Sequence, residues 1–319
     1  MKKKLAVIAF GGNAILRGNE LGTIEQQEKN TFDTCKQLIG LIKADYNIII
    51  THGNGPQVGN ILLRNEAGYE KYKIPQMPMD ICVADSQGGI GYMIERQMRN
   101  VLTEAKIRKD VVTLVTQVKI DKFDLAFSNP TKPVGPFYLK EEADLLSKKN
   151  NWNFMKDPRN RGWRKVVASP IPLEVMNNKV IKSLANTGRV VIAVGGGGVP
   201  VFKHENGYLE AIEAVIDKDL ASSLLAKEIG ADAFYIITDV PKVFINFNTK
   251  EQKALGKISV KAVKKYLEKG EFGKGSMEPK IKAAINFVEN GGKESVITDA
   301  ESLPLPNCGT RITVNWNLL

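Results

Sequence analysis

Histidine, the side chain that titrates closest to neutral pH, is scarce in this chain of 319 residues, which has only two, His52 and His204. No Ser/His/Asp arrangement and no HExxH motif can be built from them. The three cysteines, Cys35, Cys82 and Cys308, lie far apart and form no CxxC pair, so neither a disulfide framework nor a zinc site is expected. These absences favour a reducing, cytoplasmic location.

Long apolar runs are also missing, because none approaches the roughly 18 residues that a membrane-spanning helix needs. The start, MKKKLAVIAFGG, resembles a signal peptide, but Gly11 and Gly12 interrupt it early and no small-residue cleavage site follows. We expect a first β-strand here and no membrane association. The formal charge of +10 permits nucleic-acid binding, but equally a small acidic substrate.

Short β-branched runs alternate with apolar residues at helical spacing along most of the chain. The expected strands are 5–10, 47–51, 111–118, 189–194, 233–238, 295–298 and 311–316, and the expected helices are 25–44, 56–70, 80–106, 173–187, 217–229 and 276–290. Most of the strands are continuous apolar runs, which is typical of strands covered on both faces. The alternation predicts an α/β fold, a mainly parallel sheet with helices on both sides.

Residues 119–165 break this alternation. They contain four prolines, two of the three tryptophans, and 11 basic against 6 acidic residues. A long, non-repetitive insertion in a compact domain is usually a functional lid or a small subdomain, and we predict one here.

Three expected strands end in glycine-rich turns, at 9–16, 51–59 and 193–201. Ligands of open parallel sheets bind at the carboxyl ends of strands, and glycine lets backbone N–H groups approach a phosphate. No GxxxxGK[ST] motif is present, which excludes a P-loop, and Gly53, Gly55 and Gly59 miss the dinucleotide spacing by one residue. The three turns therefore predict a site for a large anionic ligand such as a nucleotide. A nicotinamide or flavin enzyme remains a minor alternative.

Two lysines stand where a helix disfavours them, in its first turn near the positive end of the dipole. Lys218 lies in AVIDKDLASSLLA, and Lys280 follows Pro279. A bound polyphosphate would make both favourable. Lys132, between two prolines of the insertion, is a third candidate. Phosphoryl transfer to an acceptor that is already anionic needs such charges and no general base, which agrees with the scarcity of histidine.

These motifs together resemble the carbamate kinases, a family of the amino acid kinase superfamily. The motifs are GGNA at 11–14, HGNGPQVG at 52–59, SQGGIGY at 86–92, NPTKPVG at 129–135, GGGGVP at 195–200, AVIDKD at 214–219, TDV at 238–240 and GSMEPK at 275–280. The resemblance implies a three-layer α/β/α sandwich with a protruding lid, a homodimer, and the magnesium-dependent reaction ATP + carbamate ⇌ ADP + carbamoyl phosphate. In this family the reaction often runs towards ATP at the end of arginine breakdown.

The resemblance also implies a single domain, 1–319, with roles for particular residues. An N-terminal lobe, about 1–188, would hold carbamate and carry the lid, and a C-terminal lobe, about 189–319, would hold the nucleotide. The implied catalytic residues are Lys132, Lys218, Lys280 and Asp219, with Asp219 holding the lysines in place. The implied substrate-binding residues are Gly11, Gly12, Asn13, Gly53 and Asn54, and the implied nucleotide-binding residues are Gly196, Gly197, Asp239, Val240, Val243, Met277 and Pro279. No protein residue is assigned to the magnesium ion, which would accompany ATP or ADP.

Glu278 departs from the family pattern, in which glycine stands, and puts a negative charge beside Lys280. Ala9 and Phe10 occupy the place of a lysine found in many other superfamily members, as expected for a carbamate kinase. Two alternatives stay open: a related kinase for another small anion, and a nucleotide-binding regulator without catalysis. A nucleic-acid binder is disfavoured, because the basic excess lies in the insertion and no docking motif accompanies it.

Overall fold

The computed structural model describes residues 3–314 except 19, 158, 159 and 306. Its centre is an eight-stranded sheet in the order β15-β17-β16-β12-β1-β2-β9-β3, in which every neighbouring pair is parallel except β16 and β17. These strands are β1 (Lys4–Phe10), β2 (Tyr46–His52), β3 (Val111–Thr113), β9 (Val190–Ile192), β12 (Ala233–Thr238), β15 (Lys257–Ser259), β16 (Glu294–Asp299) and β17 (Thr310–Thr313). The predicted mainly parallel sheet is confirmed.

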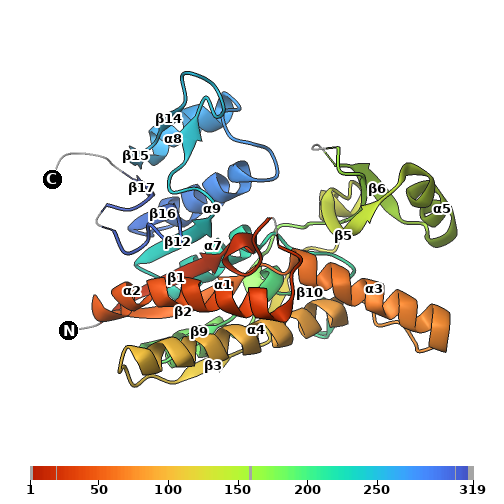
Figure 1. Cartoon of the computed structure of the whole chain (residues 1–319), viewed down its shortest axis with the longest axis horizontal. Coiled ribbons are helices and arrows are strands. Elements are labelled where there is room, and N and C mark those ends of the chain that lie inside the picture. The colour runs from red at the N-terminus through yellow and green to blue at the C-terminus, as the bar shows by residue number, and fades with distance from the viewer. Residues whose placement is uncertain (1–2, 19, 158–159, 306, 315–319) are drawn as a thin grey trace.

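Helices cover both faces of this sheet (Figure 1). Alternate residues of β1 face opposite layers: Ile8 packs in the same apolar cluster as residues of α1 and α4, whereas Val7 packs in the same cluster as residues of α7 and α9. The helices are α1 (Ile24–Gln37), α2 (Ile39–Lys43), α3 (Gly55–Tyr72), α4 (Met79–Glu104), α6 (Asn178–Asn186), α7 (Lys218–Ile229), α8 (Val260–Glu268) and α9 (Met277–Glu289). A strand buried on both sides has no polar face, which is why β1 reads as an unbroken apolar run.

A small subdomain, called the lid below, comprises residues 132–167. It contains the antiparallel sheet β5-β7-β6 and one helix, with the bounds β5 (Lys132–Tyr138), α5 (Lys140–Asn150), β6 (Asn153–Lys156) and β7 (Trp163–Val167). Figure 1 shows it projecting from the body beside α3. The sequence placed the start of this insertion at 119, but residues 117–119 form β4, which pairs with strands of the body.

Smaller sheets complete the body. One has the order β11-β10-β4-β8 and the other pairs β13 with β14; their bounds are β4 (Gln117–Lys119), β8 (Glu174–Val175), β10 (Val199–Lys203), β11 (Leu209–Ala211), β13 (Phe244–Ile245) and β14 (Lys253–Ala254). The expected strand 111–118 is therefore two strands, β3 and β4, in different sheets. The expected helix 173–187 is wrong at its start, because its first residues form β8 and α6 begins at Asn178.

Two further sequence expectations differ from the structure. The expected helix 25–44 is two helices, because α1 ends at Gln37 and α2 begins at Ile39. The expected division between lobes near residue 189 does not follow the sheet, because β9 lies between β2 and β3 on the N-terminal side. Within the described residues, no helix is both long and apolar enough to cross a membrane.

Glycine allows the lid to approach the body closely. A Cβ atom at Gly59 of α3 would lie 2.6 Å from the Cα atom of Gly135 in β5, and Gly135 itself has a φ of +72°. A contact this short forces backbone to move, because no flexible side chain can yield. The packing of α3 against β5 therefore depends on the absence of a side chain at this position.

We predict that Gly59→Ala lowers the free energy of unfolding by about 1–3 kcal/mol, the usual cost of overpacking. Gly68→Ala in the same helix is the matched control, because the nearest atom to its Cβ would be 3.9 Å away. The control should be as stable as the wild type or more so, by up to about 1 kcal/mol, since alanine favours helix. Urea unfolding measures both, and a Gly59→Ala protein as stable as Gly68→Ala would contradict the prediction.

Candidate active site

A cavity of about 540 Å³ lies at the carboxyl ends of β1, β2 and β12, where the lid faces the body. Its wall brings together segments that are distant in the sequence. Of the predicted site residues, it contains Gly11, Gly12, Asn13, Gly53, Asn54, Lys132, Gly196, Lys218, Asp219, Asp239, Val240, Met277, Pro279 and Lys280. The position at the strand ends follows from the parallel sheet, which directs successive turns to one edge.

Asp219 lies between two of the predicted lysines and joins them. Its Oδ1 accepts a hydrogen bond from Lys218 Nζ at 2.6 Å, and its Oδ2 accepts one from Lys280 Nζ at 2.8 Å. The carboxylate is only 3% exposed. Burial alone raises the pKa of Asp219, but the two ammonium groups outweigh it and hold the pKa well below its usual range. The carboxylate therefore stays ionised and fixes both lysines.

The two lysines differ in their electrostatic surroundings. Burial dominates at Lys218 and lowers its pKa, although Asp219 opposes this. At Lys280 burial also lowers the pKa, but the charge and hydrogen bond of Asp219, together with the charges of Asp217 and Asp239, outweigh it and the net shift is upward. The aliphatic stem of Lys218 passes over Gly53, where a Cβ atom would lie 3.1 Å from the lysine Cδ. The second glycine turn thus leaves the room that Lys218 occupies.

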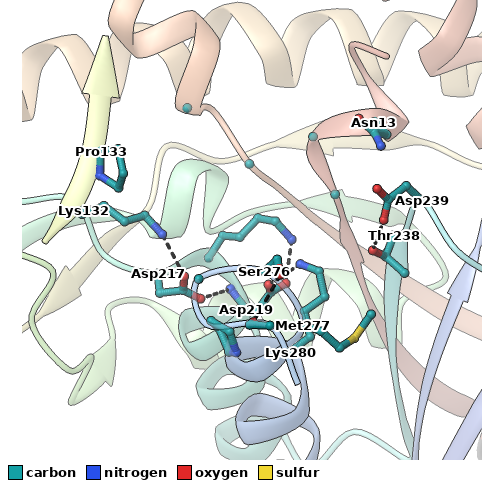
Figure 2. Close-up of a pocket in the computed structure, with 18 of the residues that line it drawn as sticks. Asn13, Lys132, Pro133, Asp217, Asp219, Thr238, Asp239, Ser276, Met277 and Lys280 are labelled. Carbon is teal, nitrogen blue, oxygen red and sulfur yellow. Dashed lines mark hydrogen bonds and ion pairs between the residues drawn. The ribbon is translucent and has the colours of Figure 1, made fainter. Parts of the chain in front are cut away.

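Asp217 holds the lid lysine. Its Oδ2 accepts a hydrogen bond from Lys132 Nζ at 2.8 Å, while its Oδ1 accepts bonds from the backbone N–H groups of Asp219 and Leu220 and so caps the start of α7. Figure 2 shows Lys132 reaching Asp217 from the lid strand while Lys280 points to Asp219. The three predicted lysines thus converge on two adjacent carboxylates.

The cavity wall also contains apolar side chains. Phe244, Phe247 and Phe272 line it together with Met277 and Val240. Figure 2 places Asp239 and Thr238 on the side of the cavity away from Lys132, and the Thr238 hydroxyl donates a hydrogen bond to Asp239. These apolar side chains could pack against a flat, apolar group of a ligand.

Two predicted residues stand outside the wall. Val243 is fully buried, and its backbone N–H donates to Thr310 Oγ1. Gly197 packs against the backbone of Ile216, because a Cβ atom there would lie 2.5 Å from the Ile216 carbonyl oxygen. Both support neighbours that do line the cavity, Phe244 and Gly196.

Sequence reasoning missed several wall residues, among them Asp217 as the partner of Lys132, and the three phenylalanines. Asp217 had a signal, because an aspartate directly before a helical pattern is a preferred N-cap. The phenylalanines had none, because a phenylalanine in an irregular segment looks the same whether it packs in a core or faces a ligand.

Glu278 does not face the cavity. Its carboxylate pairs with Lys282 one turn further along α9, at 2.7 Å, and the residue is absent from the cavity wall. The structure thus assigns this departure from the family pattern to the helix surface.

We predict that Glu278→Gln changes the kcat and KM of the reaction catalysed at this site by less than about threefold, because an i,i+4 pair contributes only a few tenths of a kcal/mol. Steady-state kinetics would contradict this if kcat fell tenfold or more.

His52 lies at the end of β2 and is buried, with Nδ1 positioned 3.0 Å from the carbonyl oxygen of Gly53. Burial, reinforced by the charge of Lys218, lowers its pKa from 6.5 to about 4. The imidazole is therefore neutral at pH 7. It is a structural group here and carries no charge towards the cavity.

We predict that this burial makes stability depend on pH. Because the folded pKa of His52 is depressed, its contribution is complete above pH 6.5 and is lost as the pH falls towards about 4, at a total cost of about 3 kcal/mol. Urea unfolding between pH 7.5 and 4 should show this loss in the wild type and in His204→Asn, but not in His52→Asn. An equal loss in His52→Asn would contradict the assignment.

No group of three or more histidine, cysteine, aspartate or glutamate side chains in the described part of the chain could hold a metal ion. In addition, the oxygens of Asp217 and Asp219 that face the lysines are already engaged by ammonium groups.

Comparison with known proteins gives a consistent result. Residues 4–299 match the amino acid kinase family. The chain is 50% identical over 299 residues to the carbamate kinase of Thermococcus kodakarensis, covering 93% of this chain and 94% of that protein, and 47% identical over 302 residues to carbamate kinase 2 of Staphylococcus aureus, covering 94% and 95%. The structure is similar to that of Giardia lamblia carbamate kinase bound to AMP-PNP, with a TM-score of 0.89, 42% identity and 98% of both chains covered. The similarity thus includes the lid.

Proposed function

Because this chain belongs to the amino acid kinase family, and its relatives named above are carbamate kinases, we propose that it is a carbamate kinase. The reaction is ATP + carbamate ⇌ ADP + carbamoyl phosphate. The observation that carries the proposal is the convergence of Lys132, Lys218 and Lys280 in one cavity whose wall also contains several apolar side chains. Such a wall suits a nucleotide, because the phosphates are anionic and the base is flat and largely apolar on its faces.

We place the transferred phosphoryl group between the glycine turns and the three lysines. Gly11, Gly12 and Asn13 of the first glycine turn and Gly53 and Asn54 of the second all line the cavity. The Asn54 amide is fixed by a hydrogen bond to Ser86 Oγ at 2.8 Å. Carbamate would occupy the same end, within reach of these turns.

The lysines act by charge. In the ATP-forming direction, an oxygen of the ADP β-phosphate attacks the phosphorus of carbamoyl phosphate, the bond from phosphorus to the carbamate oxygen breaks, and carbamate leaves as an anion. No proton moves in this step. Lys218 and Lys280, held by Asp219, would neutralise charge on the phosphoryl oxygens, and Lys132 would approach them from the lid. The neutral, buried His52 is not required.

The nucleotide would lie with its base against the apolar side chains of the cavity wall. Gly196, Asp239, Val240, Met277 and Pro279 line the cavity there or along the path to the phosphates. Gly197 and Val243 would act by supporting this wall. We propose Mg²⁺ as part of the substrate, bound to the phosphates of ATP or ADP, where it would neutralise their charge.

Two further properties come from the resemblance and stay proposals: a homodimer, and a division of labour in which the N-terminal side of the sheet holds carbamate and the C-terminal side holds the nucleotide. A cytoplasmic location, which the cysteine pattern favours, is likewise a proposal. The strand order suggests that the boundary lies between β1 and β12, because the strands before α7 lie on one side of that pair and those after it on the other.

The test is ATP formation from ADP, Mg²⁺ and carbamoyl phosphate, followed with luciferase. We predict ATP from carbamoyl phosphate and none from acetylglutamyl phosphate. Lys218→Ala and Lys280→Ala should each lower turnover by about 10²–10³, the usual cost of removing a group that stabilises developing charge. Lys282→Ala is the matched control, because this lysine of α9 is 55% exposed and pairs with Glu278 away from the cavity.

Failure would take two recognisable forms. No ATP from any phosphoryl donor, with ATP binding intact, would indicate a nucleotide-binding regulator. ATP from carbamoyl phosphate with near wild-type turnover in Lys218→Ala and Lys280→Ala would keep the activity and remove the proposed roles of the lysines.

A further inference from the structure

Asp217 has two separate contacts, one for each carboxylate oxygen. Oδ1 accepts the backbone N–H groups of Asp219 at 2.9 Å and Leu220 at 3.3 Å, and thereby fixes the first turn of α7, which carries Lys218. Oδ2 accepts Lys132 Nζ from β5 of the lid, 85 residues earlier in the chain. A single side chain therefore connects the lid to the helix that carries the other charged groups.

Other ion pairs between lid and body are different in kind. Lys165 of β7 pairs with Glu213 at 3.3 Å, and Lys149 of α5 approaches Glu70 of α3 at 3.9 Å. Both of these glutamates have side chains that are 63% exposed, against 18% for Asp217, and neither lines the cavity. Exposed pairs contribute little to geometry because water competes for them. The Asp217 pair is the one that faces the cavity.

From this geometry we propose that Asp217 is a positioning residue that couples the lid to the phosphate-binding lysines. It holds the Lys132 ammonium in the cavity before any substrate enters and sets its position relative to Lys218. This inference rests on the proposed function, since the value of such coupling lies in aligning three cations on one phosphoryl group.

Lys132 does not have to leave Asp217 in order to act. An ammonium group has three N–H donors, and the hydrogen bond to Asp217 uses one of them. The remaining donors are free to turn towards phosphoryl oxygens in the cavity. Asp217 also lowers the net charge of the lysine cluster, because Asp217 and Asp219 together balance two of the three ammonium groups. Burial alone raises the pKa of Asp217, but the charge and hydrogen bond of Lys132, together with the charge of Lys218, outweigh it and lower the pKa, so the carboxylate stays ionised.

Asp217→Asn separates the two contacts. Asparagine caps a helix about as well as aspartate, so the start of α7 should be kept, whereas the ionic partner of Lys132 is lost. We expect kcat to fall about 10- to 100-fold, as for a displaced catalytic group, while KM for ADP and carbamoyl phosphate changes less than about threefold. Glu213→Gln is the matched control, because it removes a different ion pair between lid and body; its kcat should equal that of the wild type.

A second measurement does not depend on activity. Spin labels at Met155→Cys in the lid and Tyr92→Cys on α4 use two exposed positions, and the native cysteines are buried. The distribution of distances between the labels, without substrate, should broaden in Asp217→Asn. If that variant does not fold, Lys132→Met breaks the same pair from the lid side and should broaden the distribution equally.

An unchanged distance distribution would overturn the proposal, as would a loss of kcat no greater than in Glu213→Gln. If the wild type forms no ATP from carbamoyl phosphate, the proposed function fails, but the distance measurement still decides whether Asp217 holds the lid.

Discussion

The site depends on the pairing of the Asp219 carboxylate with the ammonium groups of Lys218 and Lys280. Two lysine side chains can be buried side by side only if an anion lies between them, because uncompensated charge is costly away from water. Asp219 provides that anion with one oxygen for each ammonium group. The same contact joins the first turns of α7 and α9, so the packing of two helices and the position of two charges are set together.

This arrangement needs the parallel sheet. In such a sheet, successive strands lead into turns at the same edge, so residues near positions 11, 53, 218 and 239 meet although they are far apart in the sequence. Helices that begin at that edge direct their positive ends into the cavity, and a bound polyphosphate would satisfy them. The lysines in the first turns, unfavourable for an isolated helix, are therefore favourable in a helix that faces an anion.

The lid adds the third charge from a separate sheet. Because β5 pairs with β7 of the lid, which in turn pairs with β6, it can carry Lys132 to the cavity without being a strand of the body. The lid is joined to the body at a few places, notably the close approach of Gly59 to Gly135 and the ion pair of Lys132 with Asp217. These contacts can position the lid accurately and still allow substrates to enter the cavity.

Much of the site could be predicted from the sequence, because its main signals are local. Glycines at the ends of apolar strands and lysines in first turns violate ordinary propensities, and each violation indicates a ligand. Lys218 and Lys280 were found in this way, and the structure brings both to Asp219. The start of the lid was not, because VVTLVTQV is equally suitable for one long strand and for two short ones, and only the pairing of β4 with β10 separates them. Phe244, Phe247 and Phe272 of the cavity wall could not be predicted, because no local sequence pattern distinguishes them from phenylalanines of the core.

By itself, the sequence determined the class of fold, the glycine turns and the identity of the charged groups, because periodicity and helix-start rules act over a few residues. The resemblance of ordered motifs added the family. The resemblance also implied that Asp219 holds lysines of the site, and in the structure it contacts Lys218 and Lys280. Only the tertiary structure decided that Asp217 takes Lys132 and that Glu278 turns away to Lys282. These pairings depend on where helices and lid lie in space, and contacts between residues 61 or 85 positions apart leave no mark on the local pattern.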